Sequence, residues 1–478
     1  MKKRSFLLLT LISVLQLNAQ DFAVTESLKV AGGVGNHHPQ VELIEPGRVG
    51  VTWTSSGTKN VYFAKHNGVD GFADPVQLNP EGLDVQSYDW SGPDFAVEGD
   101  NVYVVFRSNG HETGHIYMVK STDKGETFGD TVRVDALDEG YGQFPDLAVL
   151  NDTVYVTFMN HDDGGANPSY EVARSVDGGL TFEEEVLAAS IIPGESCDCC
   201  QPEIIVNDEY VMVFFRNNDD NIRDIKAVTS IDRAVSFTEW ISLDDHNWYV
   251  EACPATGPDA RFIEDDKVVA TYKTEVGDEP KVFLNVYDLE ADESTDLVEI
   301  YSPMGTGDAL NYPQVCYNDE VIGVVWEDGG DGTSRDVFFN QSATTSIDFN
   351  PDNAMNLTAL AGVQAKPDIT LINGVFHVVY ADATDFSVYY LQIATLNAID
   401  DMEANIDAKI SATLNQVIIT YGEENTAQLV VTDINGRLIQ QQIITDSKTI
   451  LTMDKWESGV YVVTLISGDQ RMVKKIVR

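Results

Sequence analysis

The chain has 478 residues, with 30 Lys and Arg against 77 Asp and Glu, so its formal net charge is −47. Hydrophobic residues make up 43%, which is typical of a globular protein with a sizeable core. Such a charge excludes a nucleic-acid binder and disfavours an anionic membrane surface, because no net basic field exists. It favours calcium binding and repels polyanions, so an anionic substrate would need a local basic pocket.

The N-terminus predicts export. Residues 1–19 begin with Lys2, Lys3 and Arg4, continue with an apolar run at 6–15 and reach Ala19 before Gln20. A basic start, a short apolar run and a small residue at the cut are typical of a secretory signal peptide, and a buried N-terminal helix is the alternative. No later stretch reaches 18 apolar residues, so we expect no membrane span.

Seven repeats predict an all-β fold, a seven-bladed β-propeller, over residues 20–397. Each repeat has a proline, an apolar strand, a turn and a second strand that ends in an aromatic residue. A regular period with four short strands per unit is typical of propeller blades. The prolines are Pro39, Pro93, Pro145, Pro202, Pro258, Pro313 and Pro367, and the aromatics are Trp53, Phe106, Phe158, Phe215, Tyr272, Trp326 and Tyr380.

The seventh repeat has only three strands before the chain becomes polar. Residues 27–30, which precede the first proline, have the pattern of the missing strand. We expect this N-terminal strand to complete the last blade, because closure leaves no open sheet edge.

The residue that follows each repeat proline is always an acid or an amide. The set is Gln40, Asp94, Asp146, Glu203, Asp259, Gln314 and Asp368. These side chains could form a ring around the channel, or each could cap the turn into its own strand. We favour local capping, because every repeat has such a residue whereas active sites are asymmetric.

Two turns have the pattern Ser-x-Asp-x-Gly-x-Thr-Phe, at residues 121–128 and 175–182, and residues 230–237 are a degenerate copy with Ala234 in place of glycine. Asp accepts bonds from the backbone of such a turn, and Gly supplies a positive φ. These are Asp-box motifs, and with them residues 21–397 resemble the sialidase superfamily. The resemblance implies a propeller whose Asp boxes face away from the active site.

Four cysteines are predicted to converge from two adjacent blades: Cys197, Cys199, Cys200 and Cys253. Together with Arg223-Asp224 and Gly257-Pro258 they resemble a subgroup of sialidase-like repeat proteins. Disulfides are the expectation in an exported protein. A soft-metal site for copper or zinc is the alternative, and the pairing is open.

Four arginines are predicted on the face that carries the active site in propellers. Arg107 and Arg216 follow closing aromatic residues, and Arg223 and Arg335 begin third strands. We expect them to bind a substrate carboxylate or sulfate. The alternative for Arg223 and Arg335 is pairing with nearby carboxylates.

The candidates for acid–base chemistry on the same face are Asp89, Glu251 and Tyr312, with His37 and His38 as further substrate-binding residues. Sialidase-like enzymes use a Tyr–Glu pair as nucleophile, and Tyr312 with Glu251 is the best match to it. Acidic turns at residues 161–165 and 217–221 could hold Ca²⁺, or could be ordinary solvated loops.

The last eighty residues predict a second, smaller domain. A polar linker at 398–405 is followed, over 406–478, by alternating apolar strands with Asn435-Gly436 as a turn. This region resembles the C-terminal sorting domain of the type IX secretion system through residues 433–437, Gly459-Val460-Tyr461 and the basic end at 474–478. The resemblance implies a secreted or surface protein whose partner is the type IX machinery.

Three functions remain open. We expect an exo-acting, sialidase-like glycoside hydrolase that acts on an acidic glycan, because the Asp boxes favour this class. A polysaccharide lyase is the first alternative, and His37-His38 near the axis favours it. A non-catalytic carbohydrate-binding or adhesive protein is the second.

Overall fold

The computed structural model describes residues 22–477 except 26, 46, 68–70, 89, 111, 137–139, 163–166, 302–309, 330–333, 373, 396–407, 413–415, 422–426, 434–437, 446, 454–455, 457–459 and 468–469. The chain divides into two compact units. One spans Val24–Ile393, and the other contains the described residues from 408 onwards. Within the described part, no helix is long and apolar enough to cross a membrane.

The described residues of the larger unit form seven sheets, as many as the sequence has repeats. The first three sheets are β3 (Asn36–Glu45), β4 (Arg48–Ser55), β5 (Asn60–Lys65) and β6 (Val76–Gln77); β7 (Asp94–Glu98), β8 (Asn101–Arg107), β9 (Ile116–Ser121) and β10 (Val132–Arg133); and β11 (Tyr141–Leu150), β12 (Thr153–His161), β13 (Ser169–Ser175) and β14 (Val186–Leu187). The fourth and fifth sheets are β15 (Glu195–Ser196), β16 (Glu203–Val206), β17 (Val211–Asn218), β18 (Ile225–Ser230) and β19 (Glu239–Ser242); and β20 (Asp259–Glu264), β21 (Lys267–Val276), β22 (Glu279–Asp288) and β23 (Glu293–Tyr301). The sixth sheet is β24 (Asn311–Tyr317), β25 (Val321–Asp328), β26 (Asp336–Ala343) and β27 (Met355–Asn356), and the seventh is β28 (Gln364–Ile372), β29 (Val375–Asp382) and β30 (Ser387–Thr395) with β1 (Phe22–Val24) and β2 (Leu28–Ala31).

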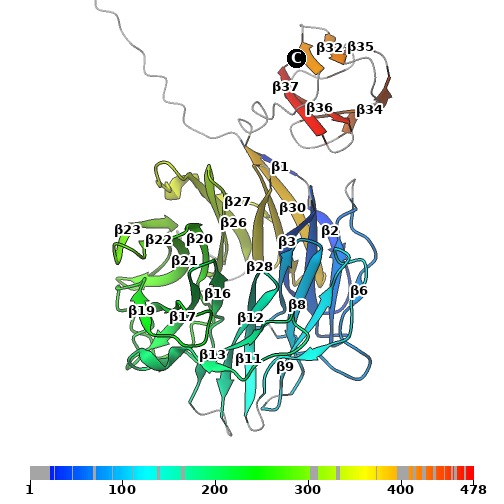
Figure 1. Ribbon diagram of the computed structural model, residues 1–478. Coiled ribbons are helices and arrows are strands. Elements are labelled where there is room, and N and C mark those ends of the chain that lie inside the picture. The colour runs from blue at the N-terminus through cyan, green and yellow to red at the C-terminus, as the bar shows by residue number, and fades with distance from the viewer. Residues whose placement is uncertain are drawn as a thin grey trace, which may run out of the picture. The chain divides into compact units, whose positions relative to one another are not determined.

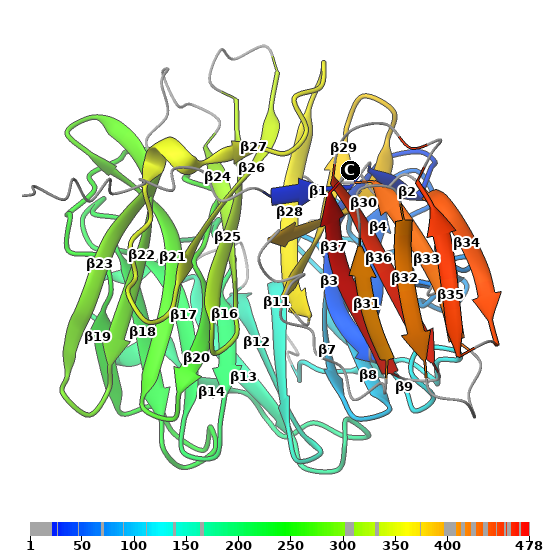
Figure 2. The same cartoon turned by 90° about the horizontal axis from the view of Figure 1, so that it is seen from above.

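The first strands of these sheets contact one another in turn, from β3 through β7, β11, β16, β20 and β24 to β28, and β28 contacts β3 again. The last strands, such as β19 and β23, lie at the periphery in Figure 1, and Figure 2 shows the same sheets from above. This arrangement confirms the expected β-propeller.

The N-terminal strand completes the last sheet, as the sequence predicted. β2 pairs antiparallel with β30, with Leu28 opposite Tyr390 and Lys29 opposite Tyr389. Lys29 Nζ also lies 2.7 Å from Asp385 Oδ2. The first and last segments of the propeller are therefore held in one sheet.

The repeated aromatic residues form the core between sheets. All seven lie on the second strand of their sheet and are at most 1% exposed. Trp53, for example, packs in one apolar cluster with Val379 and Tyr390 of the last sheet. Burial of one such side chain contributes about 1.5–3 kcal/mol, so the repeat pattern mainly encodes the packing of neighbouring sheets.

The turns at residues 121–128 and 175–182 have the internal bonds expected of their sequence. Asp123 Oδ1 accepts from the backbone N–H of Thr127 at 2.8 Å, and Ser121 Oγ accepts from the N–H of Gly125 at 2.9 Å. Bonds to Thr127 are the main cause that lowers the pKa of Asp123 to about 2. In the turn at 175–182, Ser175 Oγ accepts from the N–H of Gly179 and Asp177 Oδ1 accepts from the N–H of Thr181 in the same way.

The turn at residues 230–237 keeps this geometry at a conformational cost. Ala234 has a φ of +60°, close to the +78° of Gly125 at the corresponding position. Ser230 Oγ still accepts from the N–H of Ala234 at 2.8 Å. A left-handed alanine is strained because its Cβ approaches the following carbonyl oxygen.

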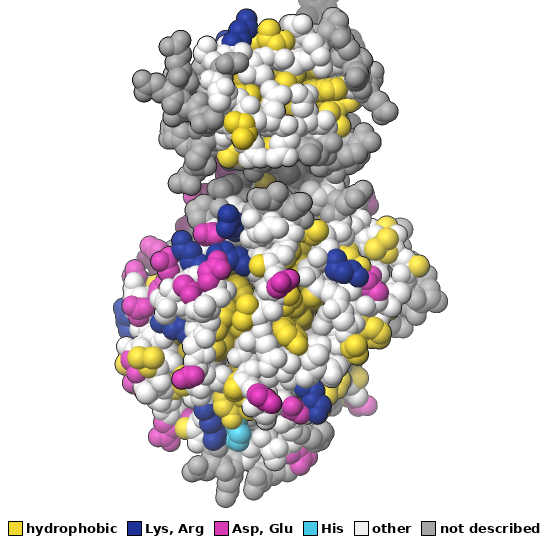
Figure 3. Space-filling model, turned by 90° about the vertical axis from the view of Figure 1, so that its right-hand side faces the viewer, with side chains coloured by type: hydrophobic (Ala, Val, Ile, Leu, Met, Phe, Trp, Pro, Cys, Tyr) yellow, Lys and Arg dark blue, Asp and Glu magenta, His cyan; other side chains and the backbone are white. Residues whose placement is uncertain are grey.

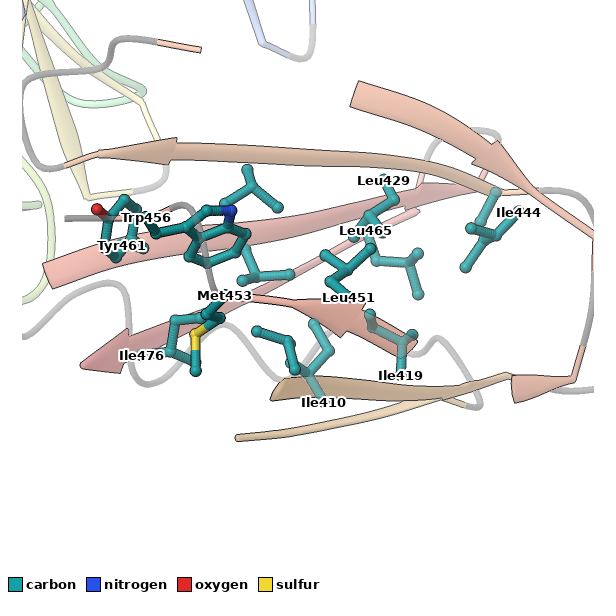
Figure 4. Close-up of a cluster of buried hydrophobic side chains, with 14 residues drawn as sticks. Ile410, Ile419, Leu429, Ile444, Leu451, Met453, Trp456, Tyr461, Leu465 and Ile476 are labelled. Carbon is teal, nitrogen blue, oxygen red and sulfur yellow. The ribbon is translucent and has the colours of Figure 1, made fainter. Parts of the chain in front are cut away.

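The smaller unit is a β-sandwich, as expected. Its sheets are β31 (Ala408–Ala412), β32 (Gln416–Tyr421) and β35 (Lys448–Thr452), and β34 (Leu438–Ile444), β33 (Ala427–Asp433), β36 (Val460–Ser467) and β37 (Gln470–Val477). A single apolar cluster that includes Leu429, Trp456 and Leu465 fills the space between them (Figure 4). This unit thus has a core of its own.

Candidate functional site

Four of the acids that follow the repeat prolines bond their own sheet to the next one. Asp368 Oδ2 accepts from the N–H of Val41 at 2.6 Å, and Asp146 Oδ2 accepts from the N–H of Ile204 at 2.6 Å. Asp94 and Asp259 bond the next sheet in the same way. We expected each of these side chains to cap the turn into its own strand. That prediction was wrong, because each of these carboxylates accepts a hydrogen bond from the first strand of the next sheet.

These acids surround a cavity of about 400 Å³ that the first strands line. Arg261 NH1 lies 2.6 Å from both Glu203 Oε1 and Asp259 Oδ1. Burial raises the pKa of Asp368 to about 8 and that of Glu42 to about 7, since neighbouring carboxylates add to the desolvation cost. Asp368 and Glu42 therefore keep their protons to a higher pH than the same acids do in water.

The residue that precedes each repeat proline occupies what we call the rim position. It is His38, Gly92, Phe144, Gln201, Gly257, Tyr312 and Lys366 in chain order. Four of these have a left-handed backbone, with φ of 46° at His38, 51° at Phe144 and Tyr312, and 53° at Lys366. At each of the four, the pairing of the first strand shifts register. Such bulges redirect side chains and are frequent beside active sites.

Three of the redirected side chains come together, and we call His38, Tyr312 and Lys366 the rim cluster. The rings of His38 and Tyr312 meet edge to face at 6.0 Å, and Lys366 Nζ lies 3.6 Å from the centre of the Tyr312 ring. His38 and Tyr312 line the cavity. First strands β3, β24 and β28, from three consecutive sheets, therefore contribute one polar cluster.

A buried carboxylate supports this cluster from behind. Glu327 is fully buried, and its Oε1 lies 2.8 Å from Arg335 NH1 and 3.9 Å from Lys366 Nζ. Its Oε2 accepts from the N–H of Lys366 at 2.8 Å. Arg335 is thus paired with a carboxylate, which was the alternative considered for it, and it lies beside the rim cluster.

Glycine at the rim position of the second sheet makes room for His38. A Cβ built on Gly92 would lie 2.2 Å from His38 Cβ, a distance that real side chains do not tolerate. One on Gly257 would lie 1.8 Å from the carbonyl oxygen of Gln201. Glycine is therefore needed at both rim positions, because a side chain there would collide with His38 or with the backbone of Gln201.

Two predicted substrate ligands have structural roles instead. Arg216 is 0% exposed, and it donates to the carbonyls of Thr256, Arg223 and Lys273 at 3.1, 2.5 and 2.7 Å. Its guanidinium also lies 4.9 Å from the centre of the Trp248 ring. The expectation that Arg216 binds substrate is corrected, because each of its three guanidinium nitrogens donates to a backbone carbonyl.

Arg107 is in a similar position. It is 2% exposed and donates to the carbonyls of Gly142, Ser108 and Gly110. Burial lowers its pKa to about 10. The sequence could not distinguish Arg107 from a surface arginine, because position alone does not show that carbonyl groups surround the side chain.

Arg223 lies in the cysteine cluster rather than in an anion pocket. It is 8% exposed, and its NH1 donates to Cys197 Sγ at 3.2 Å. Cys199 and Cys253 form a disulfide, which ties the fourth and fifth sheets together as predicted. Cys197 and Cys200 are free and buried, with their Sγ atoms 3.3 Å apart, so the expected second disulfide is not formed.

The remaining candidates are spread over the face. Glu251 is exposed and accepts from the hydroxyl of Tyr249 at 2.6 Å, so the structure pairs Glu251 with Tyr249 and Tyr312 with Lys366. His37 is half-buried on β3. Asp89 lies outside the described residues, as does most of the acidic turn at 161–165. In the other turn, Asn218 Oδ1 accepts from the N–H of Asn221.

Two exposed aromatic residues of the larger unit are Trp90 and Tyr249, and Trp90 lies beside the cavity wall. Trp90 is 44% exposed and stacks on Tyr88, with ring centres 5.0 Å apart. The side chain of Gln201, which lines the cavity, donates to the carbonyl of Trp90. Tyr249 is 59% exposed. Trp90 thus offers a flat apolar surface on a chain segment that is bonded to the cavity wall.

Sequence reasoning missed Lys366 and Glu327, although a signal for both was present. Lys366 precedes Pro367 as His38 precedes Pro39 and Tyr312 precedes Pro313. Glu327 follows a closing aromatic residue, as Arg107 and Arg216 do. Alignment of the repeats on their prolines would have grouped these residues by position, whereas a search by residue type did not.

Residues 413–478 match a family described as the secretion system C-terminal sorting domain. This match confirms the predicted sorting domain of the type IX system. The protein is therefore secreted or displayed at the cell surface. The signal peptide predicted at residues 1–19 lies outside the described residues. No curated protein sequence compared with the chain matches it.

A comparison with solved structures finds several matches, each with a TM-score below 0.5. The polysaccharide lyase Uly1 is 12% identical, with a TM-score of 0.49 over 77% of this chain and 91% of that one. The α-L-arabinofuranosidase Arb93A from Fusarium graminearum is 15% identical, with a TM-score of 0.43 over 64% and 92%. The Hadza microbial sialidase Hz136 is 13% identical, with a TM-score of 0.42 over 73% and 76%. Glycoside hydrolases and a polysaccharide lyase are thus among these neighbours, and the likeness does not extend to a reaction.

Proposed function

We propose that this protein is a secreted enzyme that cleaves an acidic glycan at the rim cluster, and that the cleavage is a β-elimination. The observation that carries the proposal is the meeting of His38, Tyr312 and Lys366 at the mouth of a cavity, each on a strained, bulged backbone. Strain of about 1–3 kcal/mol per residue persists where a function requires it.

The cluster contains the groups that elimination from a uronic acid needs. A cation beside the sugar carboxylate stabilises the negative charge that develops when the proton on the adjacent carbon is removed. Lys366 and Arg335 are the candidates for this role. A base takes that proton, the bond to the leaving oxygen breaks, and an acid protonates the oxygen. Tyr312 and His38 are the candidates for base and acid.

The surroundings suit a sugar chain. Trp90 presents an exposed ring, and aromatic faces bind the apolar faces of sugars by burying their carbon-bound hydrogens. Acidic and basic side chains are intermixed on the surface shown in Figure 3. At physiological salt the net charge of −47 acts over about 8 Å, so short contacts to Lys366 and Arg335 can still hold an anion.

Hydrolysis is the second candidate, and one observation favours it. Glu251 and Tyr249 are both exposed and share a 2.6 Å hydrogen bond. A tyrosine beside a carboxylate is the nucleophile arrangement of sialidases. In this alternative, Glu251 would take the proton of Tyr249 as its oxygen attacks the sugar.

The two reactions leave different products, so a product screen separates them. Purified protein is incubated with uronic-acid polysaccharides, sulfated glycans and sialylated glycans, and the ultraviolet absorbance and the reducing ends are both followed. Elimination gives an absorbing unsaturated sugar together with each new reducing end, whereas hydrolysis gives reducing ends alone. Tyr312→Phe should abolish the former, and Tyr249→Phe is the matched control. Binding without either product would contradict both reactions and favour an adhesive protein.

A further inference from the structure

Two thiols remain together in the cysteine cluster after the disulfide is counted. Cys197 and Cys200 are both 0% exposed, and their Sγ atoms lie 3.3 Å apart. Cys199 Sγ is 3.6 Å from Cys197 Sγ, but it is bonded to Cys253 and cannot act as a thiolate ligand. The site therefore offers two adjacent sulfur donors that are shielded from solvent.

A fixed positive charge lies beside these sulfurs. Arg223 NH1 donates to Cys197 Sγ at 3.2 Å, and Arg223 is 8% exposed. Its Nε is buried and has no hydrogen-bond partner among the described residues. A buried guanidinium with an unused donor requires a negative charge nearby, because an uncompensated buried charge is costly.

We propose that Cys197 and Cys200 bind one Cu(I) ion as a bis-thiolate site. Thiolates are soft ligands, and Cu(I) and zinc are among the metals that they favour. Binding replaces the two thiol protons with one monovalent ion, so the complex carries a charge of −1. Arg223 supplies the matching positive charge.

A divalent ion fits less well. Structural zinc takes four ligands in a tetrahedron, and the metal-ligand cluster of the described residues here consists of Cys197, Cys199 and Cys200, one of them in the disulfide. The two free thiolates would supply only two of the four ligands that a structural zinc site takes.

Cys316 provides the matched control. It is 5% exposed and lies on β24, where its thiol donates to the carbonyl of Gly323. It is a buried thiol of the same chain without a second thiol beside it among the described contacts. Its removal should leave copper binding unchanged.

The test uses the full-length protein without oxygen, with Cu(I) supplied as its complex with bicinchoninate, and measures the copper retained after gel filtration. We expect one Cu(I) per chain in the wild type and in Cys316→Ser, and at least a tenfold lower amount in Cys197→Ser and Cys200→Ser. Arg223→Gln should weaken binding by roughly tenfold, since the complex loses its counter-charge. X-ray absorption of the loaded wild type should show two sulfur ligands, a result that does not depend on any variant.

Three results would overturn the site. They are a Cys197–Cys200 disulfide in a non-reducing peptide map of the purified protein, no more copper in the wild type than in Cys197→Ser and Cys200→Ser, or a nitrogen-dominated metal shell. The site does not rest on the proposed function, because none of these measurements involves a glycan.

Discussion

Two neighbouring rings surround the channel, one residue after each repeat proline and one residue before it. In the first ring, Asp94, Asp146, Asp259 and Asp368 each bond the first strand of the next sheet. In the second ring, the residues differ from sheet to sheet. Glycine and glutamine occupy some of the positions, whereas His38, Tyr312 and Lys366 occupy the three that form the rim cluster. The comparison shows that what is repeated in this chain holds the sheets together, and what departs from the repeat makes a site.

The strongest test of this comparison is Tyr312→Phe. If the second ring is catalytic, loss of the hydroxyl should lower kcat/KM by roughly 10²–10⁴-fold, the usual contribution of a positioned acid or base. The free energy of unfolding should change little, because the ring and its contact with Lys366 remain. Activity assays with urea melts check both. Equal activity in the wild type and in Tyr312→Phe would show that the Tyr312 hydroxyl takes no part in the reaction.

Arg216→Met sharpens the comparison from the structural side. It removes a buried group that donates to three carbonyls and leaves them without a donor. We expect a loss of about 3 kcal/mol or more in the free energy of unfolding, since each unsatisfied buried group costs about 1–3 kcal/mol. A protein of normal stability with weaker glycan binding would restore the original prediction that Arg216 binds substrate.

The acid ring should make stability depend on pH. Burial raises the pKa of Asp368 to about 8 in the folded state, while the unfolded value is near 4. The folded state therefore binds more protons than the unfolded state does. The contribution of Asp368 to the free energy of unfolding is complete below about pH 4 and is lost as the pH rises towards 8. Each unit of pH in this window should lower the free energy of unfolding by about 1 kcal/mol.

Asp368→Asn keeps an oxygen to accept from Val41 and removes the titration, so it should flatten the decline between pH 5 and 8. Asp123→Asn is the control. The pKa of Asp123 is lowered to about 2, so its own contribution is lost only as the pH falls from about 4 towards 2. The Asp123→Asn protein should keep the wild-type slope above pH 5. Parallel slopes for all three proteins would contradict the buried acid.

The smallest expected effect is that of Ala234→Gly in the turn at residues 230–237. Glycine adopts the φ of +60° without strain, so the variant should gain about 0.5 kcal/mol of stability. Gly125→Ala should do the opposite, because its Cβ would lie 2.4 Å from Phe63 Cε1. Thermal melts measure both. A loss of stability in Ala234→Gly would show that the buried methyl group outweighs the strain.

The sequence by itself determined the repeated part of this protein. Prolines and aromatic residues at a fixed spacing predict the seven sheets, and the pattern at residues 27–30 predicts the strand that β2 adds to β30. The sorting domain was also readable, as its motif lies within one short segment. These features depend on local order along the chain, so periodicity and spacing reveal them.

Only the tertiary structure decided which side chains meet. Arg223 and Arg335 occur in similar positions in the sequence, yet one lies against Cys197 and the other joins Glu327 beside Lys366. His38 and Lys366 are far apart in the chain, and ring closure brings β3 against β28. Burial, bulges and contacts between sheets fix these neighbours. Such contacts are set by distance in space, which the spacing of residues along one sequence does not encode.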